Sequence, residues 1–124
     1  MAAPGGPRGA LGQRAEAAVA EFLERSGFAI VARNLRFGRL ELDVVARRGE
    51  LIVVVEVRTR GASAWTSGFG SLTFAKRERI RRAGQRLWRE RFQHDPSALH
   101  LRFDAASVHF EEAGARVDYV AAAF

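Results

Sequence analysis

Two neighbouring apolar segments of the chain each carry charged residues near one end. Glu41 and Asp43 stand two residues apart in "RLELDVVARR", and Glu56 and Arg58 stand two apart in "LIVVVEVRTR". Because side chains alternate across a strand, the members of each pair share one face of their strand. Carboxylate oxygens are the ligands that Mg²⁺ and Mn²⁺ prefer. These residues are therefore candidates for a divalent metal site at one end of a sheet.

The turn between the two segments decides whether their charged residues meet. Two β-branched runs within residues 39–60 flank Arg48-Gly49, a pattern that predicts a β-hairpin. Glycine at the second turn position fits a two-residue turn, although arginine is a poor first residue for it. A four-residue turn over 47–50 gives the same strand pairing.

Either turn places Asp43 across from Val54 and Glu41 across from Glu56, so that all the acids share one face with Arg58. Carboxylates about 5 Å apart repel by roughly 3 kcal/mol at an effective dielectric of about 20. Such a face needs a metal ion, a proton or an arginine. A loop of odd length would send Glu56 and Arg58 to the other face. The alternative is that these acids simply reach solvent or pair with nearby arginines.

The chain has 124 residues and no cysteine, which excludes a disulfide framework and a thiolate metal site. Its length suits one domain, and the absence of cysteine fits a reducing compartment. Residues 1–11 lack the apolar core of a secretory signal and predict a flexible tail. No window is apolar enough for a membrane span, so we expect no membrane contact and a soluble, cytoplasmic protein.

Periodicity and turn signals divide residues 12–124 into elements of a single domain. They predict helices at 13–25 and about 75–93, strands at 28–34, on either side of residue 48 and at 99–110, and a final strand or tail after 114. The fold class is therefore α/β, with a mixed β-sheet flanked by α-helices in the order αβββαββ.

The second predicted helix carries most of the positive charge. Residues 76–91 hold eight basic and two acidic residues, a balance of +6 that equals the net charge of the whole chain. A local excess of this kind favours an anionic partner, and nucleic acid above all. The alternative is a solvated face held by ion pairs of Glu78 with Arg82 and of Glu90 with Arg86. The candidate phosphate-binding residues are Lys76, Arg77, Arg79, Arg81, Arg82 and Arg86.

Aromatic residues lie in and beside the glycine-rich segment 61–74. Trp65, Phe69 and Phe74 could stack on exposed bases, or they could fold back onto the core. Trp88, on the second helix, is interpreted as a packing residue.

Three ordered stretches of the chain resemble one family. They are residues 12–60, from "GQRAEAAVAEFLER" to "VVVEVRTR", then "FGSLTFAKRERIRRA" at 69–83 and "RFDAASV" at 102–108, with a terminal "AF". Together they resemble the YraN family of small bacterial proteins over residues 12–124. That family is grouped with the PD-(D/E)xK nucleases and resembles archaeal Holliday-junction resolvases. The resemblance implies a restriction-endonuclease-like fold.

The resemblance also implies roles for particular residues. Glu16 matches the acid of the first helix, Asp43 the acid of the "GEID"-like strand and Glu56 the acid of the "VEVK"-like strand. In the superfamily these carboxylates hold Mg²⁺, and the residue at the position of Arg58 orients or polarises the attacking water. Lys76 matches a lysine that opens the second long helix.

Two positions depart from the family pattern. Leu40 replaces the glycine of "GEID", and Arg58 replaces the lysine of "ExK". Arginine keeps the charge and can brace a phosphate through two hydrogen bonds, but it does not give up its proton. Glu41 is a further candidate ligand for the same ion. Without the resemblance, Glu16 reads as an ordinary solvated helix residue.

Three hypotheses follow from these features. The first is a metal-dependent endonuclease that hydrolyses phosphodiesters in branched or single-stranded DNA with Mg²⁺ or Mn²⁺. The second is a nucleic-acid-binding protein that has lost, or nearly lost, cleavage. The third is a protein-interaction module. Because junction resolvases act as dimers, the resemblance adds the expectation of a homodimer.

Overall fold

The computed structural model describes residues 9–59 and 72–124, and the predicted α/β order αβββαββ is confirmed. The five strands form one sheet in the order β1-β2-β3-β4-β5, in which β3 and β4 are parallel and all other neighbours are antiparallel. The elements are α1 (Gly9–Arg25), β1 (Ala29–Phe37), β2 (Leu40–Arg48), β3 (Leu51–Thr59), α2 (Phe74–Leu87), a π-helical turn η3 (Trp88–Phe92), β4 (His100–Glu111) and β5 (Gly114–Val120).

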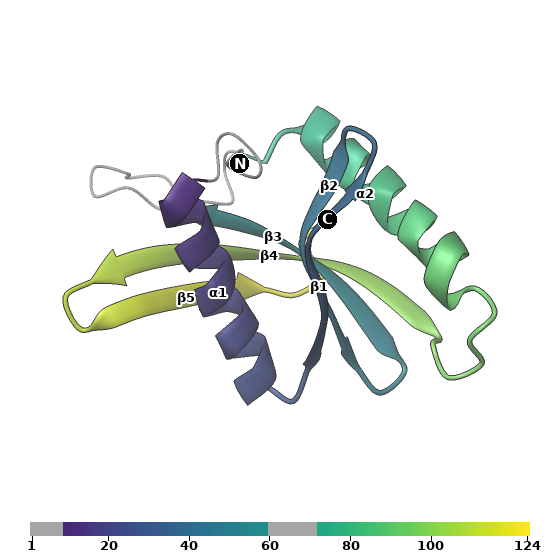
Figure 1. Cartoon of the computed structure of the whole chain (residues 1–124), viewed down its shortest axis with the longest axis horizontal. Helices are drawn as coiled ribbons and strands as arrows, with labels where there is room; N and C mark the ends of the chain where they lie inside the picture. The colour runs from purple at the N-terminus through teal and green to yellow at the C-terminus, as the bar shows by residue number, and fades with distance from the viewer. Residues whose placement is uncertain (1–8, 60–71) are drawn as a thin grey trace.

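The two helices pack on opposite faces of the sheet (Figure 1). The face under α1 is formed by alternate residues of three strands, among them Val44, Val53 and Ala106. The other face carries Val45 and Val54 and packs against α2. Because successive strand residues point to opposite sides, both faces of β2 and β3 are apolar at their centre.

A glycine lets α2 approach the sheet closely. A Cβ atom added at Gly84 would lie 2.6 Å from Cε1 and 2.7 Å from Cζ of Phe103 on β4. Such distances are shorter than van der Waals contact, so the ring of Phe103 occupies the space that a side chain at position 84 would need. Gly84 thereby sets the height of α2 above β4.

The turn between β2 and β3 differs from the prediction by one residue. Arg48 pairs with Leu51, so the turn residues are Gly49 and Glu50 rather than Arg48 and Gly49. Gly49 has a φ of 58° and stands first in the turn, where two-residue turns with a single positive φ accept glycine. The predicted pairing of Asp43 with Val54 and of Glu41 with Glu56 is therefore wrong by two residues. An even shift leaves every side chain on its predicted face.

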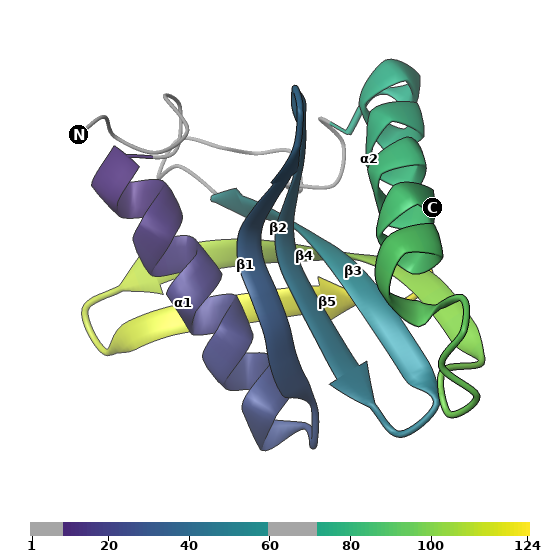
Figure 2. The ribbon, with the colours of Figure 1, turned by 45° about the vertical axis from the view of Figure 1, so that its right-hand side comes forward.

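Strands β2 and β3 separate beyond their central pairs. The ladder ends at Val44 and Val55, and Figure 2 shows the β1–β2 hairpin rising away from the end of β3. Past this point the backbone N–H of Val57 donates to Oδ2 of Asp43 at 2.8 Å. A side-chain carboxylate thus replaces the missing strand neighbour and marks a fork at this end of the sheet.

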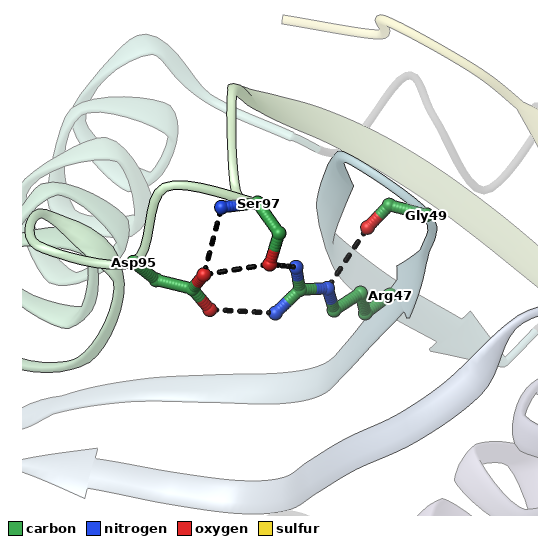
Figure 3. Close-up of polar contacts among 4 residues, drawn as sticks. All are labelled: Arg47, Gly49, Asp95 and Ser97. Carbon is green, nitrogen blue, oxygen red and sulfur yellow. Dashed lines mark hydrogen bonds and ion pairs between the residues drawn. The ribbon is translucent and has the colours of Figure 1, made fainter.

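At the other end of the β2–β3 pair, Arg47 makes hydrogen bonds beside the turn (Figure 3). The guanidinium of Arg47 donates to the carbonyl oxygen of Gly49 at 2.9 Å, to Asp95 at 3.0 Å and to the hydroxyl of Ser97 at 2.7 Å. Hydrogen bonds from Ser97, followed by those from Arg47, lower the pKa of Asp95 from 3.8 to about 2. This group of contacts joins the β2–β3 turn to the loop that follows the second helix.

A buried carboxylate anchors the C-terminal strand. Asp104 accepts two hydrogen bonds from Arg102, at 2.8 and 2.9 Å, one from the hydroxyl of Tyr119 at 2.5 Å and one from the N–H of Ala122 at 2.8 Å. Burial first, and the hydrogen bond to Asp104 second, raise the pKa of Tyr119 above its ordinary value. The network holds β5 and the residues after it against β4.

Helix boundaries differ from the sequence-based expectation at two places. The first helix begins at Gly9 rather than at residue 13, and residues 1–8 of the expected tail lie outside the described residues. The basic helix is capped by Thr73, whose hydroxyl accepts from the N–H of Lys76 at 3.2 Å, and its last turn is π-helical. No helix within residues 9–59 and 72–124 is long and apolar enough to cross a membrane.

Candidate functional site

Glu56 is a buried carboxylate with cations from two different elements. Its side chain is only 5% exposed, and it lies near the end of β3 at the fork. Nζ of Lys76 is 3.0 Å from Oε2 of Glu56, and Nε of Arg58 is 3.6 Å from the same oxygen. A buried carboxylate requires such compensation, because transfer of an isolated charge out of water is costly.

Asp43 provides a second buried carboxylate on the neighbouring strand. It is 1% exposed, and its Oδ2 accepts a hydrogen bond from the N–H of Val57 on β3 at 2.8 Å. Glu56 lies on the side of the sheet that α2 covers, since it contacts Lys76 of α2. Leu42 and Val45 pack on the α2 side and Val44 packs under α1, so strict alternation does not hold around Asp43, and the shared face of Asp43 and Glu56 stays a prediction.

Ser107 adds a polar group that the sequence did not single out. It pairs with Arg58 in the parallel β3–β4 register and is 1% exposed. No residue within the described ranges forms a hydrogen bond with its Oγ. A buried hydroxyl of this kind normally has a partner, so the position beside Arg58 can accept a water molecule or a ligand oxygen. The signal available in the sequence was a lone serine in the apolar run "DAASV".

The other two predicted ligands have different surroundings. Glu41 lies across from Arg36 of β1, with 3.6 Å between Oε2 and Nε, and so has an ion pair of its own. Glu16 is fully buried on α1, beside Ala15 and Val19. Its interpretation as a solvated helix residue is therefore wrong. Its helix covers the face of the sheet opposite to Lys76.

A divalent metal fits this site only as a hydrated ion. Within residues 9–59 and 72–124 no three His, Cys, Asp or Glu side chains are grouped closely enough to hold a metal together. The two carboxylates that share the fork are Asp43 and Glu56. Mg²⁺ keeps several waters and binds through one or two carboxylates together with substrate phosphates. The donor set therefore suits Mg²⁺ or Mn²⁺ shared with a phosphate, and the hydroxyl of Ser107 is an additional oxygen nearby.

Ion pairs along the basic helix neutralise part of its positive charge. Arg86 pairs with Glu90 at 2.9 Å, as predicted. Glu78 pairs with Arg81, three residues away, so the predicted pair of Glu78 with Arg82 is wrong. The guanidinium of Arg81 points to the side where the C-terminal residue Phe124 lies, 5.8 Å from its ring centre. Phe124 is therefore a second contact of the Arg81 guanidinium, besides Glu78.

The remaining predicted phosphate ligands divide into two groups. Lys76 contacts Glu56, and Nε of Arg77 donates to the carbonyl oxygen of Leu72 at 3.1 Å. Arg79 and Arg82 are exposed, and neither forms an ion pair or hydrogen bond with the residues that the structure describes. These two side chains are the ones fully available to an external anion.

The exposed arginines continue beyond the predicted set. Arg79, Arg82, Arg86 and Arg89 recur at intervals of three, four and three residues, which places them along one side of the helix. Arg89 is exposed and was not among the predicted residues. We call these four residues the arginine stripe.

The aromatic predictions have mixed outcomes. Trp65 and Phe69 lie outside the described residues. Phe74 does not fold back onto the core, since 75% of it is exposed. Trp88 is half-buried, packs against the core under α2 and lies 6.0 Å from the ring centre of Phe92, so its interpretation as a packing residue is confirmed.

Comparisons with known proteins agree on one family. The family model described as "Uncharacterised protein family UPF0102" matches residues 15–108. "UPF0102 protein sce2912" of Sorangium cellulosum is 52% identical over 118 residues, which span 94% of this chain and 82% of that protein. A UPF0102 protein of Myxococcus xanthus is 40% identical over 91% of this chain and 87% of its own length. One of Nitratidesulfovibrio vulgaris is 48% identical over 65% of this chain and 60% of its own length.

Proposed function

The chain belongs to the UPF0102 family, and we propose that it is a metal-dependent nuclease that hydrolyses phosphodiester bonds in branched or single-stranded DNA. The observation that carries the proposal is the burial of two carboxylates, Asp43 and Glu56, at the fork between β2 and β3, where Lys76 and Arg58 contact Glu56. Both acids have partners, Lys76 and Arg58 for Glu56 and the N–H of Val57 for Asp43, and a buried charge is tolerated only with such compensation. Buried carboxylates held by nearby cations occur at functional sites as well as in structural ion pairs.

The chemistry divides between a bound ion and the residues of this chain. Mg²⁺, when bound, would stabilise charge on the phosphate and make water a better nucleophile. Asp43 and Glu56 are the residues that would hold it. Arg58 lies beside Glu56 with a fixed positive charge and can brace a phosphate oxygen through two hydrogen bonds. Lys76 contributes a second cation at the same carboxylate.

The arginine stripe supports a nucleic-acid substrate. Arg79, Arg82 and Arg89 are exposed on the same helix whose first turn carries Lys76. Contacts of arginine with phosphates give affinity and dependence on salt rather than choice of sequence. The stripe thus offers a path for a phosphate backbone that leads toward Glu56.

A cleavage assay tests the proposal directly. Labelled four-way junctions, flaps, duplexes and single strands are incubated with the protein in Mg²⁺, Mn²⁺ or EDTA. We expect nicking that requires metal and is lost in Glu56→Gln, while Glu50→Gln on the exposed β2–β3 turn retains it. Nicking that survives in both variants, or no nicking of any substrate, would reject hydrolysis at this site.

The second candidate function is nucleic-acid binding without cleavage. Arg58 stands where the related nucleases carry lysine, and the ammonium of Lys76 already occupies Oε2 of Glu56. If that arginine limits catalysis, Arg58→Lys should raise any metal-dependent nicking. Saturable binding that weakens steeply with salt, with no nicking by either protein, would favour this candidate.

A further inference from the structure

A hollow beside the arginine stripe has the chemistry of a base-binding site. It has a volume of about 390 Å³ and is lined by Gln85, Trp88, Arg89 and Leu101. This volume is at the lower end of the roughly 300–1,000 Å³ that is usual for small-ligand sites. The lining combines an indole and a leucine with one amide and one guanidinium, so an occupant should have an apolar face and polar edges.

The hollow lies where the basic helix changes its geometry. Trp88 begins the π-helical turn that extends to Phe92, and it packs on the same core as Leu101 of β4. Single π-helical turns within helices occur frequently at functional sites, because they change the direction of neighbouring side chains. Here the wider turn accompanies an indole that is half-buried rather than fully packed.

The charge around the hollow identifies the kind of occupant. Arg82, Gln85 and Arg89 follow one another at intervals of three and four residues, so Arg82 lies on the same side of the helix as two residues that line the hollow. Arg82 and Arg89 form no ion pair with any residue in the described ranges. An apolar planar group attached to a negatively charged backbone fits both features, and an unpaired nucleotide has both.

We propose that the hollow of Gln85, Trp88, Arg89 and Leu101 binds an unpaired base of a nucleic-acid strand whose phosphates lie along the arginine stripe. The inference rests on the proposed function only in taking nucleic acid as the partner. The indole offers a stacking surface, the guanidinium of Arg89 stacks or pairs with the adjacent phosphate, and the amide of Gln85 reaches a base edge.

The distance between Lys76 and Trp88 along the helix gives the number of nucleotides between the hollow and Glu56. Lys76 and Trp88 are twelve residues apart, which is about 18 Å along a helix. A stacked strand advances about 3.4 Å per nucleotide, so roughly five nucleotides separate the base in the hollow from a phosphate at Glu56. The hollow therefore favours substrates with an unpaired region close to the site of cleavage, such as flaps and single strands.

Tryptophan fluorescence tests the proposal without any cleavage. The chain has two tryptophans, and Trp65→Phe leaves Trp88 as the only indole. The probes, all in EDTA, are a thymidine dodecamer, an abasic dodecamer with the same phosphates, and thymidine 5′-monophosphate. We expect the dodecamer to quench Trp88, the abasic strand to bind without quenching, and the monophosphate to bind far more weakly because it reaches only Arg89 of the stripe.

Matched variants separate the base from the phosphates. Arg89→Ala and Arg91→Ala remove the same charge from the same exposed turn, and only Arg89 lines the hollow. We expect Arg89→Ala to weaken binding of the thymidine dodecamer about ten-fold more than Arg91→Ala does, the order expected for one lost stack. With the abasic strand, where Arg89→Ala removes only a phosphate contact, the difference between the two variants should be clearly smaller. Because Arg89 is exposed, this comparison does not depend on the folding of a Trp88 variant.

Three results would overturn the proposal. They are equal affinity for the thymidine and abasic dodecamers, equal effects of Arg89→Ala and Arg91→Ala, or quenching by the monophosphate as strong as by the dodecamer. The first two would leave the hollow as a surface for a protein side chain, and the third would make it a site for free nucleotides. Quenching that persists in a protein without nicking activity would reject the hydrolase and retain this site, and nicking without quenching would do the reverse.

Discussion

Lys76 and Glu56 come from different layers of the protein, and their side chains meet with 3.0 Å between Nζ and Oε2. Lys76 is the only lysine in the chain, which otherwise carries its positive charge on arginines. Arg58, two residues after Glu56, approaches the same oxygen. The carboxylate at the fork is thus held by an ammonium from a helix as well as by a guanidinium from its own strand.

Removal of the ammonium should destabilise the protein. Lys76→Met leaves the buried carboxylate of Glu56 with less compensation, which we expect to lower the free energy of unfolding by about 1–3 kcal/mol. Glu56→Gln combined with Lys76→Met should cost less than the sum of the two single changes. Urea denaturation measures all three, and Arg79→Met is the control because it removes one charge from the same helix without a described contact. Equal losses in Lys76→Met and Arg79→Met would contradict this.

Mg²⁺ should stabilise Lys76→Met more than it stabilises the unaltered protein. Lys76→Met removes a cation that competes for Glu56, so an ion shared by Asp43 and Glu56 should bind more tightly. Binding to the folded state alone raises the melting temperature by mass action. We therefore expect a larger thermal shift with Mg²⁺ in Lys76→Met than in the unaltered protein. No shift in either protein would count against a metal at the fork.

A methyl group at position 84 should not be tolerated well. Gly84→Ala places a Cβ 2.6 Å from the ring of Phe103, and overpacking of this kind costs about 1–3 kcal/mol. Alanine regains about 1 kcal/mol of helix propensity, so the net loss should be about 0–2 kcal/mol. Adding Phe103→Leu should recover part of it by making space. A stabilised Gly84→Ala, measured by urea denaturation, would show that α2 can move away from β4.

The stability contributed by Asp95 should disappear in acid. Its pKa is lowered from 3.8 to about 2 in the folded protein, so its contribution is present above pH 4 and is lost as the pH falls toward 2. Asp95→Asn should therefore be less stable than the unaltered protein at pH 6, and the difference should shrink between pH 4 and pH 2. When the two proteins are compared at each pH, the contributions of the other acids to stability cancel. A stability difference that does not change with pH would contradict the lowered pKa of Asp95.

Tyr119 gives the opposite dependence at alkaline pH. Its pKa is raised above the ordinary value of 10.0, so the folded state keeps the phenol proton after the unfolded state has begun to lose it. Stability from this group is present below pH 10 and declines above it. Because Tyr119 is the only tyrosine, tyrosinate absorbance should appear together with loss of structure rather than before it. Ionisation near pH 10 in protein that remains folded would contradict the hydrogen bond to Asp104.

Sequence periodicity predicted the helices and strands of this protein well, because the periodic patterns of helices and of strands are both local. Alternation holds through "LIVVVEVRT", and there it survives an even shift in register, whereas in "LELDVVARR" Leu42 and Val45 pack on the α2 side and Val44 packs under α1. The register itself depends on the turn, where a positive φ at Gly49 moved the pairing by two residues. Propensity alone does not determine that choice.

The parts of the site that sequence reasoning missed depend on tertiary contacts. Lys76 was interpreted as a phosphate ligand because its neighbours in sequence are basic, whereas its contact is with a strand twenty residues earlier in the chain. Ser107 came beside Arg58 through a parallel pairing that no turn specifies. The burial of Glu16 follows from the side of α1 on which Ala15 and Val19 pack.

The N–H of Val57 donates a hydrogen bond to Asp43, so a substitution of Asp43 affects the backbone of β3 as well as the carboxylate. Alanine at position 43 would delete a candidate ligand and would also open a main-chain donor of β3 to solvent, so lost activity there could reflect a loosened strand end. Asparagine keeps a side-chain oxygen for Val57 and removes only the formal charge. The pair Asp43→Asn and Asp43→Ala therefore separates what this residue does for the architecture of the fork from what it does for an ion.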